Sequence, residues 1–135
     1  MSLQNTTMDN QKIKSTWDQA DQLLQSAERE MNRAQEDVVP SMVCSAARQS
    51  MAKYLIGFLL QNGIKTKAPQ SLNTLLDQCV EIEPRFNNLK LETMFCNHET
   101  IDESYCSDLT KVKSCTELAY QTKQMVVDKI WPEEK

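Results

Sequence analysis

The residues that could perform chemistry gather around the single histidine of the chain, His98. Zinc prefers thiolate and imidazole ligands, and one stretch of the sequence contains Cys96, His98, Cys106 and Cys115. Their spacing matches no common zinc finger or zinc ribbon, and Cys115 falls on an apolar helical stripe, where a thiol packs as a small hydrophobic group. A catalytic Cys–His pair is also disfavoured, because His98 lies in a polar segment without helical periodicity. We therefore predict no metal, no cofactor and no catalytic residue.

Lysines form a second group with a recognisable chemistry, the binding of phosphate. The lysines considered are Lys53, Lys65, Lys67, Lys111, Lys113 and Lys123. Lys65 and Lys67 follow the second predicted helix, and Lys111 and Lys113, early in the last helix, would approach them if the two helix ends were neighbours. Such a cluster, with Tyr54 or Tyr105 to stack on a base, would suit a nucleotide. The alternative is that these lysines only solvate exposed helix faces, which is the usual role of charged residues.

The composition predicts a globular, helical domain. A chain of 135 residues is long enough for one domain with one hydrophobic core. Apolar residues make up 40% of it and charged residues 25%, which is typical of globular proteins. The sequence has only two glycines and four prolines and is rich in leucine, glutamine, lysine and glutamate, so helices are favoured over strands. The net charge of −4 disfavours non-specific binding of nucleic acid but allows a local basic patch.

The cysteine content and the N-terminus indicate a cellular location. Five cysteines, an odd number, and a polar start without a signal peptide predict reduced thiols and a cytoplasmic protein. No stretch reaches the ~18 consecutive apolar residues that a membrane-spanning helix needs. We therefore expect no membrane partner.

Apolar residues recur at helical spacing in four long segments and one short one. These segments cover residues 8–36, 40–62, 69–82, 85–95 and 107–131. Asp37 is the expected N-cap of the second segment, and Pro69 is expected in the first turn of the third. The second helix should be the central one, because it is apolar nearly all round near its C-terminus. Within it, Gly57 is expected to allow a close helix crossing, and Gly63 to end the helix in a left-handed conformation.

These segments predict an all-α fold, an up-and-down bundle of four to five helices. Loops of a few residues between them favour antiparallel neighbours. The bundle should occupy residues 9–131. We expect residues 1–8 to be a disordered N-terminus or a cloning remnant, and residues 132–135 to be a tail.

Several landmark residues resemble those of the HEPN family, the higher eukaryotes and prokaryotes nucleotide-binding domains. Trp17 lies on the first helix, and CSAARQSMAKYLIGFLLQNGI (residues 44–64) is similar to the family's second helix, where small residues and a lysine precede an apolar run and a closing glycine. QSLNTLLDQCVEIEPRF (residues 70–86) resembles a family segment that begins His-Ser-Leu, and IDESY (residues 101–105) resembles the approach to an Arg-Tyr-Pro element. The resemblance covers about residues 10–131 and implies a HEPN-like bundle.

The sequence departs from the family where catalytic members have their active site. RNases of the family use an arginine followed one to two turns later by a histidine on a late helix, and the expected last helix contains neither. Gln70 stands where the family has a loop histidine, and the Arg-Tyr-Pro element reads Ser104-Tyr105-Cys106. RNA cleavage needs an acid–base group and a cation for the developing phosphate charge. The resemblance therefore implies a divergent, non-catalytic member.

The lysines and the resemblance together predict a non-enzymatic module that binds a nucleotide or RNA, or that acts as the partner of a nucleotidyltransferase. The expected ligand-binding residues are Lys53, Lys65, Lys67, Gln70 and Tyr105. A homodimer is expected as well, because similar domains pair through helix faces and the second helix has more apolar surface than a small bundle covers. Two alternatives are left open. One is a metal-independent RNase of a toxin–antitoxin type, with His98 as acid–base group and Arg85 as phosphate clamp, and the other is a structural dimerisation bundle.

Overall fold

The computed structural model of the chain describes residues 3–66, 71–91 and 109–131. These residues form helices and no strand, so the predicted all-α class is confirmed. The elements are α1 (Leu3–Met31), η1 (Gln35–Asp37), α2 (Pro40–Gln61), α3 (Leu72–Ile82), η2 (Pro84–Asn88) and α4 (Leu109–Val126), where η denotes a 3-10 helix. α1 begins at Leu3, whereas the apolar pattern predicted a start near residue 8. None of the described helices combines the length and the apolar character needed to cross a lipid bilayer.

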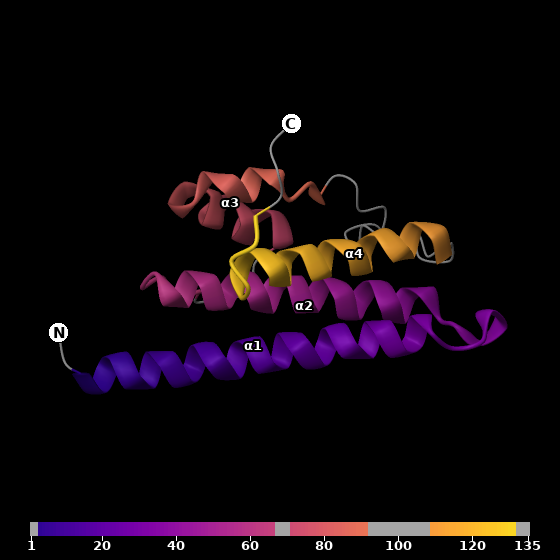
Figure 1. Cartoon of the computed structure of the whole chain (residues 1–135), viewed down its shortest axis with the longest axis horizontal. Helices are drawn as coiled ribbons and strands as arrows, with labels where there is room; N and C mark the ends of the chain where they lie inside the picture. The colour runs from indigo at the N-terminus through magenta and orange to yellow at the C-terminus, as the bar shows by residue number, and fades with distance from the viewer. Residues whose placement is uncertain (1–2, 67–70, 92–108, 132–135) are drawn as a thin grey trace.

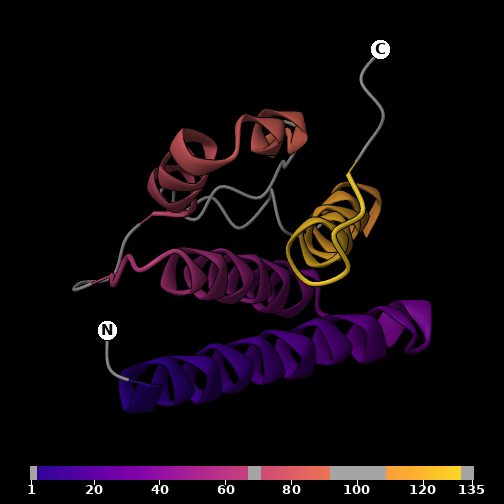
Figure 2. The same ribbon diagram turned by 60° about the vertical axis from the view of Figure 1, so that its left-hand side comes forward.

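α2 lies in the middle of the bundle, with α1 on one side and α3, η2 and α4 on the other (Figures 1 and 2). α1 and α2 form an antiparallel hairpin (Figure 1). α4 runs in the same direction as α2 and opposite to α1, and it packs against both (Figure 1). A seam between α1 and α4 therefore runs along one side of the bundle.

Burial of its side chains confirms the predicted central position of α2. The apolar residues predicted on its inner side are all buried, and they are Val43, Ala47, Met51, Tyr54, Leu55, Phe58 and Leu59. Helices of the same chain cover them, so the excess apolar surface from which we inferred a homodimer is not found there. Among the described residues, the exposed large apolar ones are Val39, Met42, Ile64, Ile82, Tyr120, Val127 and Ile130, and of these Met42 lies on the outer side of α2.

α1 crosses α2 closely because Gly57 has no side chain, as predicted. The indole of Trp17 lies against Gly57, and its Nε1 donates a hydrogen bond to the carbonyl oxygen of Tyr54 at 3.2 Å. A Cβ atom on residue 57 would lie 2.1 Å from Trp17 Nε1, far inside van der Waals contact. About two turns before Gly57 on α2, Ser50 Oγ donates a hydrogen bond to the carbonyl oxygen of Ala20 on α1 at 2.8 Å. This bond also connects the two helices.

The C-terminus of α2 also has the predicted form. Gly63 has a φ of 81°, in the left-handed region. Its N–H donates to the carbonyl oxygen of Leu60 at 3.0 Å, and the N–H of Ile64 donates to that of Leu59 at 2.8 Å. This pair of bonds defines a Schellman motif, which satisfies carbonyl groups that a helix end otherwise leaves unpaired.

α2 begins at Pro40 as predicted, but its predicted cap residue and the predicted start of α3 are wrong. Val39 rather than Asp37 is the N-cap residue of α2, and its N–H donates to a carboxylate oxygen of Glu30, on α1, at 2.9 Å. α3 begins at Leu72 instead of Pro69, because the hydroxyl of Ser71 accepts a hydrogen bond from the N–H of Thr74 at 3.1 Å and so caps the helix.

Trp131, the last described residue, packs in an aromatic cluster with Phe86 of η2. The ring of Phe86 meets Phe58 and Trp131 edge to face, with centroid distances of 4.8 and 5.2 Å. Lys129, with a φ of 59°, turns the chain after α4. The last helix was predicted to continue to residue 131 with Ile130 on its buried stripe, but it ends at Val126 and Ile130 is 56% exposed.

Candidate functional site

Two of the five predicted ligand-binding residues lie in the described part of the chain, and they are not close to one another. Lys65 is exposed just beyond the C-terminus of α2. Lys53 is half-buried and lies eight residues before the end of that helix (61 − 53), which is about 12 Å along the axis. Lys67, Gln70 and Tyr105 lie outside the described residues. In the part of the chain that the structure describes, Lys65 is the residue that marks the predicted basic corner.

Lys113, in the N-terminal half of the last helix, does not approach that corner. Because α4 runs parallel to α2, the N-terminal halves of the two helices pack side by side, and Cys44 Sγ and Cys115 Sγ lie 3.7 Å apart. Lys113 therefore lies near the start of α2, whereas Lys65 follows its end. The suggested cluster of Lys65 with Lys111 and Lys113 required α4 to begin at the other end of α2, and it is wrong.

The guanidinium of Arg85, the phosphate clamp of the RNase alternative, is already engaged. Arg85 Nε and Nη2 donate to the two carboxylate oxygens of Glu83 at 3.1 and 3.0 Å. The same guanidinium lies over the ring of Trp131, 4.3 Å from its centroid, in a cation–π contact. This carboxylate lowers the positive potential that Arg85 could offer to a phosphate. His98 lies outside the described residues.

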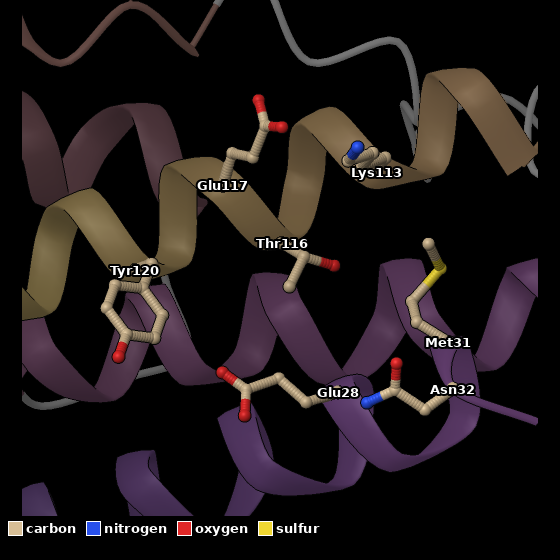
Figure 3. A pocket seen from close by; sticks show the side chains of 7 residues that line it. All are labelled: Glu28, Met31, Asn32, Lys113, Thr116, Glu117 and Tyr120. Atoms are coloured by element: carbon tan, nitrogen blue, oxygen red, sulfur yellow. The ribbon is translucent and has the colours of Figure 1, made fainter.

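The seam between α1 and α4 opens into a groove near the end of α1 (Figure 3). The groove has a volume of about 450 Å³. Its lining residues are Glu28, Met31, Asn32, Lys113, Thr116, Glu117 and Tyr120. In Figure 3, Thr116 points from α4 toward α1, and it is faced by Glu28 on α1 and by Asn32 just after the end of that helix. A cavity of this size is in the range of sites for small molecules.

The groove contains one buried polar atom whose hydrogen bonding is unsatisfied. Thr116 Oγ1 is shielded from solvent and has no hydrogen-bond partner among the described residues. Burying a hydroxyl without a partner costs free energy, so few such groups occur in folded proteins. Tyr120, one turn further along α4, is 48% exposed and offers an aromatic ring at the rim. The groove thus combines an apolar body, an aromatic ring and an unsatisfied hydroxyl.

A polar cluster closes the same seam further toward the C-terminus of α4. The buried hydroxyl of Tyr54 donates a short hydrogen bond to Asp21 Oδ1. Lys123 Nζ, on α4, pairs with the same carboxylate oxygen at 3.4 Å. One carboxylate of α1 thereby joins α2 and α4. Burial raises the pKa of the Tyr54 phenol above its ordinary value, and the hydrogen bond and negative charge of Asp21 raise it further.

The raised pKa of Tyr54 predicts a loss of stability in alkaline solution. The unfolded phenol ionises near pH 10, whereas the folded phenol keeps its proton. The contribution of the Tyr54 phenol to the free energy of unfolding is therefore fully present below about pH 10. Above that pH it falls by about 1.4 kcal/mol per pH unit. We expect urea unfolding of Tyr54→Phe to show a cost of about 1.5 kcal/mol at pH 8, from loss of the bond to Asp21, and a weaker decline above pH 10.

The exposed Tyr120 provides a matched control for this measurement. Tyr120→Phe should leave both the stability at pH 8 and the alkaline decline unchanged. Burial also raises the pKa of the Cys79 thiol, to about 12. Ionisation of this thiol lowers the free energy of unfolding above about pH 9. The effect is the same in the wild type, Tyr54→Phe and Tyr120→Phe, so it cancels in the comparison. Equal alkaline declines in the wild type and Tyr54→Phe would contradict the assignment.

Sequence reasoning missed most of the groove residues. Met31 was recognised only as an apolar residue, and Lys113 only as one of several lysines. Glu28, Thr116 and Tyr120 have no motif or distinctive spacing, and they come together only because α4 packs antiparallel to α1. Among the described residues, no group of three or more histidine, cysteine or acidic side chains is arranged to bind a metal ion.

No family model, curated protein or solved structure matches this chain. The fold and the groove define an all-helical domain with a small-molecule-sized cavity in an interhelical seam. The HEPN resemblance stays a prediction from the sequence.

Proposed function

We propose that the protein is a non-enzymatic, HEPN-like binding module whose ligand occupies the groove between α1 and α4. The single observation that carries the proposal is the buried, unsatisfied hydroxyl of Thr116 in that groove. A ligand whose polar group reaches Thr116 Oγ1 would give this hydroxyl the hydrogen-bond partner that it lacks among the described residues. The adjacent ring of Tyr120 offers a stacking surface for a planar ligand.

The lining of the groove favours a nucleoside or a nucleoside monophosphate over a triphosphate. Tyr120 can stack on a base, and the amide of Asn32 can donate to and accept from the polar edge of a base. The charged residues of the lining are two carboxylates, Glu28 and Glu117, and one ammonium, Lys113. The lining therefore has a formal charge of −1 (one cation minus two anions). A triphosphate would be repelled by this charge, whereas one phosphate beside Lys113 would be partly compensated. An RNA chain fits the same lining less well, for the same reason.

Titration of the protein with nucleosides and nucleotides tests the proposal. We would titrate the four common ribonucleosides, with their mono- and triphosphates, by calorimetry and by amide NMR. At least one nucleoside or monophosphate is expected to bind, with the largest shifts at the groove residues of α1 and α4. Tyr120→Ala should weaken binding about fivefold or more, because stacking on one aromatic ring is worth roughly 1–3 kcal/mol.

Two variants distinguish a site from a merely structural effect. Ile82→Ala removes a partly exposed apolar residue on α3, away from the groove, and should leave binding unchanged. Thr116→Val removes the unsatisfied hydroxyl at nearly constant volume, so it should weaken binding while leaving stability equal or higher. Failure of every compound to bind, or shifts centred on Lys65, would contradict the groove as the ligand site.

A second candidate function, self-association, has one supporting observation. Tyr120 and Ile130 are both about half exposed and line a hollow formed by α4 and the residues after it, with a volume of about 470 Å³. Exposed apolar residues that share a hollow are typical of surfaces that meet another protein. The occupant in this case would be a second copy of the chain or a nucleotidyltransferase partner. Sedimentation of the purified protein at increasing concentration distinguishes the two occupants. A second copy would give concentration-dependent association that is lost in Ile130→Ser, whereas a different partner protein would leave the purified chain monomeric.

A further inference from the structure

Two cysteines from different helices meet inside the core, on the side of α2 that faces α4. Cys44 lies in the second turn of α2 and Cys115 in the second turn of α4. Their Sγ atoms are 3.7 Å apart, and both residues are fully buried. The third described cysteine, Cys79, is also buried, but its thiol lies 3.8 Å from the carbonyl oxygen of Leu55 on the α3 side of the core.

The geometry is compatible with a covalent bond between Cys44 and Cys115. A disulfide requires an Sγ–Sγ distance of about 2.05 Å, so the two sulfur atoms must approach by about 1.7 Å. A rotation of the Cys side chains with a small shift of α4 can supply this movement, because Cys115 lies near the start of its helix. Helix ends open locally at a lower free energy than helix centres, which also gives a small oxidant a route to the thiol.

We propose that Cys44 and Cys115 form an oxidisable dithiol that closes to an intramolecular disulfide between α2 and α4, with a peroxide as the oxidant. One thiolate attacks a peroxide oxygen, the O–O bond breaks, and a sulfenic acid and hydroxide form. The second thiol then attacks the sulfenic sulfur, the S–S bond forms, and the S–O bond breaks with loss of water. In total, two thiols and one hydrogen peroxide give one disulfide and two water molecules.

The disulfide would act on the groove through the residue that follows Cys115. Thr116 lines the groove, so a bond at Cys115 would fix the α4 wall against α2. This consequence depends on the proposed function. The disulfide itself depends only on the positions of the two thiols, so a protein that binds no nucleoside can still form it.

Mass spectrometry of the oxidised protein tests the dithiol directly. We would work with Cys96→Ser/Cys106→Ser protein, which keeps the three described cysteines and excludes the two that lie outside the described residues. Treatment of the folded protein with hydrogen peroxide should lower the intact mass by about 2 Da, reversibly with a reducing agent. Proteolytic mapping should recover one linked pair, Cys44 with Cys115.

A stability measurement and two variants complete the test. The two cysteines are 71 residues apart in the chain (115 − 44), and cross-linking a loop of that length should raise the melting temperature by on the order of 10 °C. Cys115→Ala should abolish the mass change, whereas Cys79→Ala should retain it. Links that involve Cys79, links between two chains, or a mass change that occurs only in urea would overturn the proposal, as would the absence of any change in the folded protein.

Discussion

Gly57→Ala is expected to lower the free energy of unfolding by about 3 kcal/mol, a large effect for the addition of one methyl group. The new Cβ would lie 2.1, 2.6 and 2.9 Å from three atoms of the Trp17 indole. The indole cannot move away without loss, because its Nε1 is bonded to the carbonyl oxygen of Tyr54. Either the hydrogen bond breaks or α1 moves away from α2. Urea unfolding followed by circular dichroism measures the effect.

The sign of the Gly57→Ala effect should reverse once Trp17 is removed. In a Trp17→Ala background the contact is absent, and alanine is preferred over glycine within a helix by about 0.5–1 kcal/mol. The second substitution should then stabilise the protein. Gly63→Ala serves as the control for glycine replacement in general, because nothing lies within 4 Å of a Cβ there and only the left-handed φ costs about 1–2 kcal/mol. A Gly57→Ala cost that is the same in both backgrounds would contradict the close crossing.

Phe86→Ala is expected to lower the free energy of unfolding by about 4 kcal/mol. Phe86 is fully buried, and its ring is the common neighbour of Phe58 and Trp131. Its removal leaves a cavity under η2 and removes two aromatic contacts, so the segment after α4 also loses its support. Thermal and urea unfolding measure the change, and the intrinsic fluorescence of Trp131 should shift to longer wavelength in a Trp17→Phe background as its ring becomes hydrated.

The neighbours of Phe86 supply graded controls. Trp131→Ala removes one partner of the ring and should cost less, about 2 kcal/mol. Arg85→Ala removes an exposed guanidinium with a cation–π contact and should cost at most about 1 kcal/mol. The expected order of cost is therefore Phe86, then Trp131, then Arg85. An Arg85→Ala cost equal to that of Phe86→Ala would mean that the ion pair, and not the buried ring, holds η2 in place.

The parts of the fold that could be predicted are those encoded by neighbouring residues. The apolar circumference of α2 indicated its burial, and Gly57 and Gly63 were identified correctly because a close crossing and a left-handed helix end each need a residue without a Cβ. The cap of α2 was missed because its carboxylate comes from Glu30, on another helix. The early end of α4 was missed because Lys129, a residue that rarely takes a positive φ, makes the turn.

The candidate site could not be predicted because it depends on helix direction. Loop lengths favoured antiparallel neighbours, but the direction of the last helix relative to α2 then depends on whether the short segment at residues 85–95 reverses the chain. Once α4 is placed parallel to α2, Lys113 joins the groove and does not reach the predicted corner at Lys65. Thr116 is a mid-helix threonine like many others, and only the packing of α4 against α1 makes its hydroxyl noteworthy.

Asp21 accepts from two donors that are reached along the chain by routes of very different length. Tyr54 is 33 residues away (54 − 21) and Lys123 is 102 residues away (123 − 21). Closing the longer route costs about 1 kcal/mol more in chain entropy, because this cost rises with the logarithm of loop length. Of the two helices that form the groove, α4 is therefore the one that docks last during folding and that separates at the lower cost in free energy. A ligand larger than a nucleoside would therefore enter the groove by displacing α4, while the α1–α2 hairpin stays in place.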